Sequence, residues 1–473
     1  MQRGWQQLGT AWMPFADVAT AELPLSRLLR LSLFQVSVGM ATTLFVGTLN
    51  RVMIVEMGIA ATIVAVMVAI PLLVAPFRAL IGFRSDTYKC VLGWRRVPFI
   101  WFGTMMQFGG LAIMPFALIV LSPAELDQPH WAGYVGSALA FFLVGLGAAT
   151  TQTAGLALAT DLVPEERRPR VVALMYLMML VGTVLAAFAL GIALRDYSPI
   201  LLIKVIQGAG LFTLIINTIS LWKQEVRVRG VVPYGKTERR PVFREAWQTF
   251  IAGGDAVRLL VATGFGFFAF NLQDVLLEPY GGEILRLSVG ATTALTGIAA
   301  LGAIASFALA ARSLERGGDP IRLAALGCGA GIMSFAVIIF AAPLDSGLMF
   351  RIGTAGIGFG EGLFAVATLT AAMGLRDQAQ HGIALGAWGA VYATSEGLAF
   401  AVSGVMKDVV SYVVASGRLG DGLALASVPY SVVYHVEILM LFATFVALGP
   451  LAARSRAVVR QERAVFGLAD LPA

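Results

Sequence analysis

Residues 171–193 read VVALMYLMMLVGTVLAAFALGIA, a run of apolar and small residues without a charged side chain. About 20 residues at a rise of 1.5 Å each cross the ~30 Å hydrocarbon layer of a bilayer. A helix pairs its backbone N–H and C=O groups within the segment, which lipid requires. The sequence lacks the ten-residue alternation typical of barrel strands. This run therefore predicts a transmembrane helix.

Comparable apolar runs recur along the whole chain. They predict twelve spans, near residues 28–50, 60–82, 97–121, 134–158, 171–193, 199–222, 256–277, 288–311, 321–342, 348–373, 383–406 and 429–452. The composition agrees, because 58% of the 473 residues are hydrophobic and only 13% are charged, whereas a soluble domain carries about 25% charged residues. We expect an all-α membrane protein.

The longest polar stretch, 223–255, is rich in Lys and Arg and separates six spans from six. It predicts a basic cytoplasmic linker between two six-helix halves, 28–222 and 256–452, as in transporters built from parallel repeats. Residues 1–27 and 453–473 are then cytoplasmic flanks.

The first flank carries Trp5, Leu8, Trp12 and Phe15 at helical spacing. This pattern predicts either an amphipathic helix in the membrane interface or a poorly ordered tail.

The basic residues indicate the orientation. With both termini cytoplasmic, most of the 34 Lys and Arg fall in the termini and the even-numbered loops, which is the positive-inside pattern. The net charge of +6 then reflects topology and attraction to anionic lipid headgroups rather than nucleic-acid binding.

The loop after the second span carries a recognisable motif. Gly82 and Asp86 are followed by Gly93 and the basic pair Arg95 and Arg96. This pattern resembles the loop signature of the major facilitator superfamily, stretched by an insertion. We expect Gly82 to allow close helix packing and Asp86 to pair with an arginine or a helix N-terminus.

Ionisable side chains inside spans cost roughly 2.5–3.5 kcal/mol each and need a reason. They serve either a substrate or proton pathway, or pairing between helices and hydration near the surface. The candidates besides those at the ends of spans 1 and 7 are Arg78, Arg351, Glu361 and Glu396. The sequence contains no phosphate-binding loop, no Cys or His cluster at metal-ligand spacing and no nucleophile elbow. We therefore expect neither a metal site nor an enzyme.

Several strings together resemble one family. They occupy residues 49–56, 82–86, 93–103, 150–161 and 273–282. They look like the bacteriochlorophyll delivery family, a branch of the major facilitator superfamily that includes PucC and LhaA. The N-terminus and the chain length resemble the LhaA type, which serves the core antenna, more than the PucC type.

The resemblance implies an assembly factor for light-harvesting antenna in the bacterial inner (intracytoplasmic photosynthetic) membrane. Its implied partners are antenna polypeptides and bacteriochlorophyll, with chlorophyll synthase and membrane insertion machinery nearby. A secondary transporter that moves a small solute by alternating access is the alternative.

Polar groups at the ends of spans 1 and 7 are the first candidates for binding pigment or a partner. They are Asn50, Arg51, Glu56, Gln273, Asp274 and Glu278. Alternatively, these residues only hold the two halves together. His435 is a further candidate pigment ligand, although histidine is scarce, with three in the chain.

Overall fold

The computed structural model describes residues 24–74, 81, 84–85, 94–121, 130–164, 168–225, 255–374, 381–418 and 420–464. Four sequence-predicted residues lie outside this part of the chain: Arg78, Gly82, Asp86 and Gly93. The expected interfacial helix, most of the linker and the end of the C-terminal flank also lie outside it.

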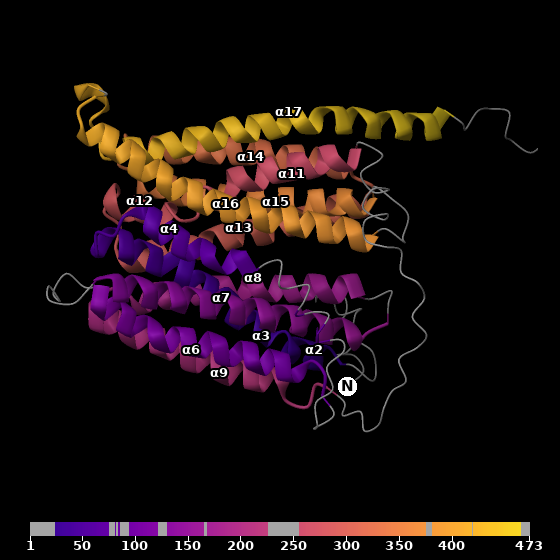
Figure 1. Cartoon of the computed structure of the whole chain (residues 1–473). Helices are drawn as coiled ribbons and strands as arrows, with labels where there is room; N and C mark the ends of the chain where they lie inside the picture. Colours follow the sequence, from indigo (N-terminus) through magenta and orange to yellow (C-terminus); the bar gives the residue numbers. More distant parts are fainter. Residues whose placement is uncertain are drawn as a thin grey trace, which may run out of the picture. The chain divides into compact units, whose positions relative to one another are not determined.

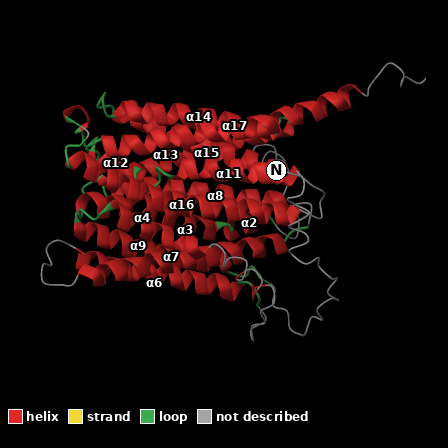
Figure 2. Ribbon diagram, turned by 45° about the horizontal axis from the view of Figure 1, so that its top comes forward, coloured by secondary structure: helices red, strands yellow, loops and turns green. Residues whose placement is uncertain are grey.

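Every regular element in the described part is helical (Figure 2). The first half contains α2 (Leu25–Leu31), α3 (Leu33–Thr42), η2 (Thr43–Leu49), η3 (Val52–Glu56), α4 (Ala61–Ala69), η4 (Ile70–Val74), α6 (Val97–Leu121), α7 (His130–Asp161), α8 (Arg168–Ala193) and α9 (Pro199–Leu221). The second half contains α11 (Asp255–Asn271), α12 (Leu277–Glu283), α13 (Val289–Glu315), α14 (Pro320–Ala341), α15 (Gly347–Gly374), α16 (His381–Ala415), η7 (Asp421–Leu423) and α17 (Val428–Ala464).

Ten helices among the described residues are long and apolar enough to cross a membrane. Two shorter apolar helices, Ala61–Leu72 and Ala256–Asn271, stand where the second and seventh spans are expected. The chain is thus a multi-pass, all-α membrane protein, as the apolar runs predict.

The helices pack into two compact units. Unit 1 contains the described residues up to 225 together with Val275–Ala300, and unit 2 contains 255–274 and the described residues from Leu301 onward. Figure 1 follows the chain through these elements. The helix α12 and the first part of α13 therefore pack with unit 1, although they follow the linker in sequence.

Small residues set the closest helix contacts within each unit. In unit 1, a Cβ on Gly39 of α3 would come within 2.5 Å of the Met179 carbonyl of α8. In unit 2, a Cβ on Gly360 of α15 would come within 2.8 Å of the Gly327 carbonyl of α14. Such approaches gain van der Waals contact where lipid removes the hydrophobic drive between helices.

Spans 1 and 7 both depart from regular α-helix. The first span ends in the π-helical turns η2 and η3, on either side of Asn50 and Arg51. The seventh span breaks after Asn271, and the chain turns through 272–276 before α12 begins. π-turns and broken helices often mark functional positions in membrane proteins.

Candidate functional site

The π-helical end of span 1 meets α12 and α13 through a polar seam, formed by Thr48, Asn50, Arg51, Glu278, Thr293 and Thr296. The Asn50 amide donates to the Val275 carbonyl at 3.1 Å and to Glu278 Oε2 at 3.4 Å. The Thr296 hydroxyl donates to Glu278 Oε1 at 3.0 Å. Both Asn50 and Glu278 are buried, so each supplies a partner that the other lacks in lipid.

Arg51 forms the outer end of the seam. Its Nη1 donates to Glu56 Oε1 at 2.5 Å and its Nη2 donates to the Leu287 carbonyl at 3.3 Å. A Cβ on Gly282 would come within 2.9 Å of Arg51 Nε, so glycine leaves the guanidinium room against α12. The side chain is 5% exposed and that of Glu56 is 35% exposed. The ion pair therefore links the interior of unit 1 to its surface.

The loop before α9 adds Tyr197 to this end of the seam. Partial burial raises the pKa of Tyr197, the Glu56 carboxylate raises it further, and Arg51 lowers it. The pKa of Tyr197 therefore depends on the charges of both Glu56 and Arg51, and its titration reports on their ion pair.

The structure brings together four of the six residues predicted at these span ends: Asn50, Arg51, Glu56 and Glu278. Asn50 donates a hydrogen bond to Glu278, and Arg51 forms an ion pair with Glu56. Pigment or partner binding by these residues stays a prediction.

The other two, Gln273 and Asp274, belong to unit 2. The Gln273 amide donates to the Asp274 carboxylate, and Gln273 itself is buried.

A carboxyl group near these two residues, that of Glu437, is not among the candidates that the sequence predicts. Glu437 of α17 is 0% exposed, and neither of its carboxyl oxygens has a hydrogen-bond partner among the described residues. The Asp274 carboxylate is close enough for its charge to act on Glu437. Its position mid-way along an apolar run was the available signal, because any ionisable residue there needs an explanation.

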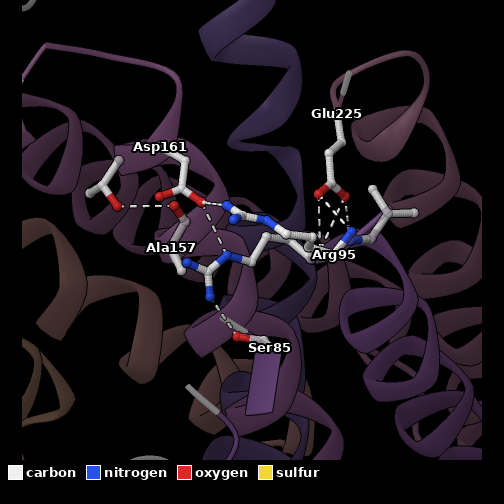
Figure 3. A network of polar contacts seen from close by, with 8 residues as sticks. Ser85, Arg95, Ala157, Asp161 and Glu225 are labelled. Carbon is white, nitrogen blue, oxygen red and sulfur yellow. Dashed lines mark hydrogen bonds and ion pairs between the residues drawn. The ribbon is translucent and has the colours of Figure 1, made fainter. Parts of the chain in front are cut away.

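The basic pair of the loop motif binds the end of α7. Arg96 Nε lies 3.1 Å and Arg95 Nη2 lies 3.5 Å from Asp161 Oδ2. Arg96 Nη1 also donates to the Ser85 hydroxyl at 2.6 Å. Figure 3 shows the two guanidinium groups pointing toward Asp161. Asp86 lies outside the described residues, so its expected pairing stays a prediction. The acid that pairs with Arg95 and Arg96 is Asp161.

Glu225 binds the other side of the same pair. Its carboxylate accepts from the backbone N–H groups of Arg95 at 2.8 Å, Arg96 at 3.1 Å and Val97 at 2.9 Å (Figure 3). These N–H groups open α6, where no intrahelical acceptor exists and where the helix dipole favours a negative charge. The contact fastens the segment after α9 to the start of α6.

The remaining candidates are spread over unit 2. Arg351 is exposed at the start of α15. Glu361 of α15 and Glu396 of α16 are half-buried. His435 of α17 is exposed, and its Nδ1 lies 2.6 Å from the Ser431 carbonyl oxygen of the preceding turn.

Comparison with known proteins gives extensive matches. The chain matches the family described as PUCC protein over residues 48–456. It is 54% identical to Protein PucC of Rhodovulum sulfidophilum over 85% of this chain and 89% of that protein. It is 50% identical to an uncharacterised protein of the puhA–bchM intergenic region of Rhodobacter capsulatus, over 98% of both chains. The Bacteriochlorophyll synthase 44.5 kDa chain of Rhodobacter capsulatus is 27% identical, over 92% of this chain and 97% of that one.

Solved structures support the fold. A bacterial homologue of the human lysosomal transporter Spinster, in an inward-facing and unoccupied conformation, aligns with a TM-score of 0.66 at 17% identity, covering 89% of this chain and 96% of that one. A bacterial homologue of the iron transporter ferroportin aligns with a TM-score of 0.63 at 13% identity, covering 90% and 98%. The fold is that of the major facilitator superfamily, as the loop motif and the six-plus-six spans predict.

Proposed function

Because this chain belongs to the PUCC protein family, we propose that it is a membrane-embedded assembly factor that supplies bacteriochlorophyll to light-harvesting antenna polypeptides. The observation that carries this proposal is the 54% identity to a PucC protein over most of both chains. The relative named as a bacteriochlorophyll synthase chain supports the same photosynthetic setting. Relatives of this kind favour the antenna role over a general solute carrier.

The buried polar groups of unit 1 support assembly over ion-coupled transport. Along its long helices they are amides and hydroxyls such as Gln107 and Asn217. The buried ionisable residues Arg51, Arg96 and Glu278 lie at span ends or in the short helix α12. Ion-driven carriers place ionisable groups along the pathway inside the membrane. A factor that hands over pigment within the membrane needs no such pathway.

The proposed role sets the remaining properties. The protein acts without chemistry of its own, between the source of bacteriochlorophyll, a chlorophyll synthase, and antenna polypeptides leaving the insertion machinery. It resides in the intracytoplasmic photosynthetic membrane with both termini cytoplasmic, as the basic loops indicate. We propose the core antenna as the client, because the N-terminus and the chain length resemble those of the LhaA type.

A second function, solute transport by alternating access, has the fold likeness to inward-facing transporters in its favour. One experiment separates the two. The protein is purified in mild detergent from its native membrane, and its near-infrared spectrum and co-purifying polypeptides are determined. Bacteriochlorophyll together with antenna subunits supports assembly. Colourless protein without antenna subunits that takes up solute after reconstitution into vesicles contradicts it.

A further inference from the structure

Three aromatic rings of unit 2 form a fixed platform. Phe267 of α11 meets Trp388 at 5.5 Å and Tyr392 at 4.6 Å between ring centroids, both edge-on. Trp388 and Tyr392 lie one turn apart on α16 with their ring planes only 9° from parallel. Phe267 is fully buried, while the other two rings are half-buried. Trp388 and Tyr392 stack on each other at 5.8 Å between ring centroids, so each ring covers part of the other, and both remain half-buried.

Two carboxyl groups lie further along α15 and α16, towards the middle of these spans. Trp388 Nε1 donates to Thr368 Oγ1 at 3.1 Å, which fixes the level of α16 against α15. Consecutive spans run in opposite directions, so a step back along α15 and a step forward along α16 lead the same way. Seven residues at 1.5 Å each cover about 10 Å from Thr368 and from Trp388. Those steps arrive at Glu361 and beside Glu396.

The rings and the two acids come from three helices that contact one another, α11, α15 and α16. We call this set the aromatic–carboxyl wall: Phe267, Trp388, Tyr392, Glu361 and Glu396. Glu361 is half-buried in the middle of a span and has no hydrogen bond or ion pair within the described part of the chain. A carboxyl group at that depth costs roughly 2.5–3.5 kcal/mol on insertion scales, which a ligand would offset.

The glycines of α15 serve a different purpose. Gly353 and Gly360 pack against α14, and Gly362 packs against α13. Helix packing therefore accounts for these glycines but not for Glu361, which lies on another face of the same helix.

We propose that the aromatic–carboxyl wall binds the magnesium macrocycle of a bacteriochlorophyll, with Glu361 supplying an oxygen ligand to the magnesium and Trp388 and Tyr392 contacting the ring. The inference rests on the proposed function for the presence of the pigment. Magnesium prefers oxygen ligands. Aromatic side chains pack in offset or edge-on contact with extended π-systems. The wall supplies both kinds of group from neighbouring helices of unit 2.

Binding of two pigments to the full-length protein tests the proposal. The protein is made in a host without bacteriochlorophyll, purified in detergent and titrated with bacteriochlorophyll a, or with bacteriopheophytin a, which has the same macrocycle without magnesium. The near-infrared band and induced circular dichroism report binding. We expect Glu361→Leu to weaken bacteriochlorophyll binding by about tenfold or more while leaving bacteriopheophytin binding unchanged.

Further variants separate the ring contacts from the fold. Tyr392→Leu should weaken both pigments by a similar factor, because it removes ring contact and not the magnesium ligand. Glu315→Gln changes an exposed carboxyl on α13 that lies outside the wall. This control should bind as the wild type does, and thermal unfolding checks that each variant is folded.

The outcomes distinguish this inference from the function on which it rests. Wild-type binding that Glu361→Leu leaves intact overturns the wall as the site, while pigment handling stands. Equal loss of both pigments in Glu361→Leu overturns the magnesium contact. If the wild type binds neither pigment, both the wall and pigment delivery are overturned.

Discussion

The side-chain amide of Asn50 donates a hydrogen bond to a carboxylate oxygen of Glu278, 3.4 Å away and 228 residues further along the chain. Asn50 stands between two π-helical turns, and Glu278 stands in the short helix that follows the break in span 7. The two irregular regions of the backbone therefore meet at one buried hydrogen bond. A local departure from α-helix is stable in lipid only where other groups satisfy the backbone, as Asn50 does for the Val275 carbonyl.

Asn50→Ala should destabilise the protein. It leaves the Val275 carbonyl and one Glu278 oxygen without their donor, at a cost of about 1–3 kcal/mol for buried groups. Thermal unfolding in detergent measures the loss. Gln207→Ala removes an exposed amide from α9 and serves as the control. An equal effect of the two substitutions would show that the seam adds nothing to stability.

The titration of Tyr197 should report the Arg51–Glu56 ion pair. Because the Glu56 charge raises the pKa of Tyr197, Glu56→Gln should lower that pKa. Tyrosinate absorbance during an alkaline titration measures it, and Tyr197→Phe identifies the contribution of this residue. A Tyr197 pKa that Glu56→Gln leaves unmoved would refute the charge contact.

The raised pKa of Tyr197 also gives stability a defined pH dependence. A folded-state pKa above the unfolded value means that the folded state holds its proton longer. The stability contributed by neutral Tyr197 is therefore present below the unfolded tyrosine pKa of about 10 and lost as the pH rises through the folded value. Tyr197→Phe should reduce this alkaline loss, as denaturation at several pH values would reveal.

Glu225→Ala should loosen the start of α6. It removes the acceptor of three backbone N–H groups, and the loss of a helix cap costs about 0.5–2 kcal/mol. Thermal unfolding measures the effect, with Asp196→Asn, an exposed acid between α8 and α9, as the control. Glu225→Asp tests whether the side-chain length matters. Unchanged stability of Glu225→Ala would mean that water replaces the carboxylate without cost.

Glu437→Gln should stabilise the protein. The Glu437 carboxyl is fully buried and unpaired among the described residues, and it lies near the Asp274 charge. Replacing this acid by a neutral amide of the same shape removes the free-energy cost of bringing a group that is ionised in the unfolded chain into the buried site. Antenna assembly in vivo, measured alongside unfolding, tells whether Glu437 is retained for function. A less stable Glu437→Gln would indicate that the acid has a partner that glutamine cannot keep.

Local sequence predicted much of this protein because membrane insertion depends on local properties. Apolar runs of sufficient length specify spans wherever they occur, as at 171–193, since lipid excludes unpaired backbone groups. The family resemblance carried by short strings is likewise confirmed by the match over residues 48–456. The closer likeness to the LhaA type stays a prediction.

The partners of individual polar residues could not be predicted in the same way. The sequence placed Asn50 and Glu278 at matching span ends. It did not predict that Glu225 caps α6 or that Glu437 is buried without a hydrogen-bond partner among the described residues. Each depends on residues distant in sequence, such as Glu225 and Val97, that only helix packing brings within hydrogen-bond distance. Periodicity and composition contain no information on which distant groups meet.

The sequence by itself therefore determined the membrane class, the twelve apolar segments, the family and the candidate polar positions. Tertiary structure alone decided that the end of span 1 pairs with α12, and that Asn50 binds Glu278 while Gln273 and Asp274 pack in unit 2 with Glu437. The physical reason is that burial in lipid is a property of each segment. A hydrogen bond, by contrast, is short-ranged and directional, and it exists only once both of its segments are packed.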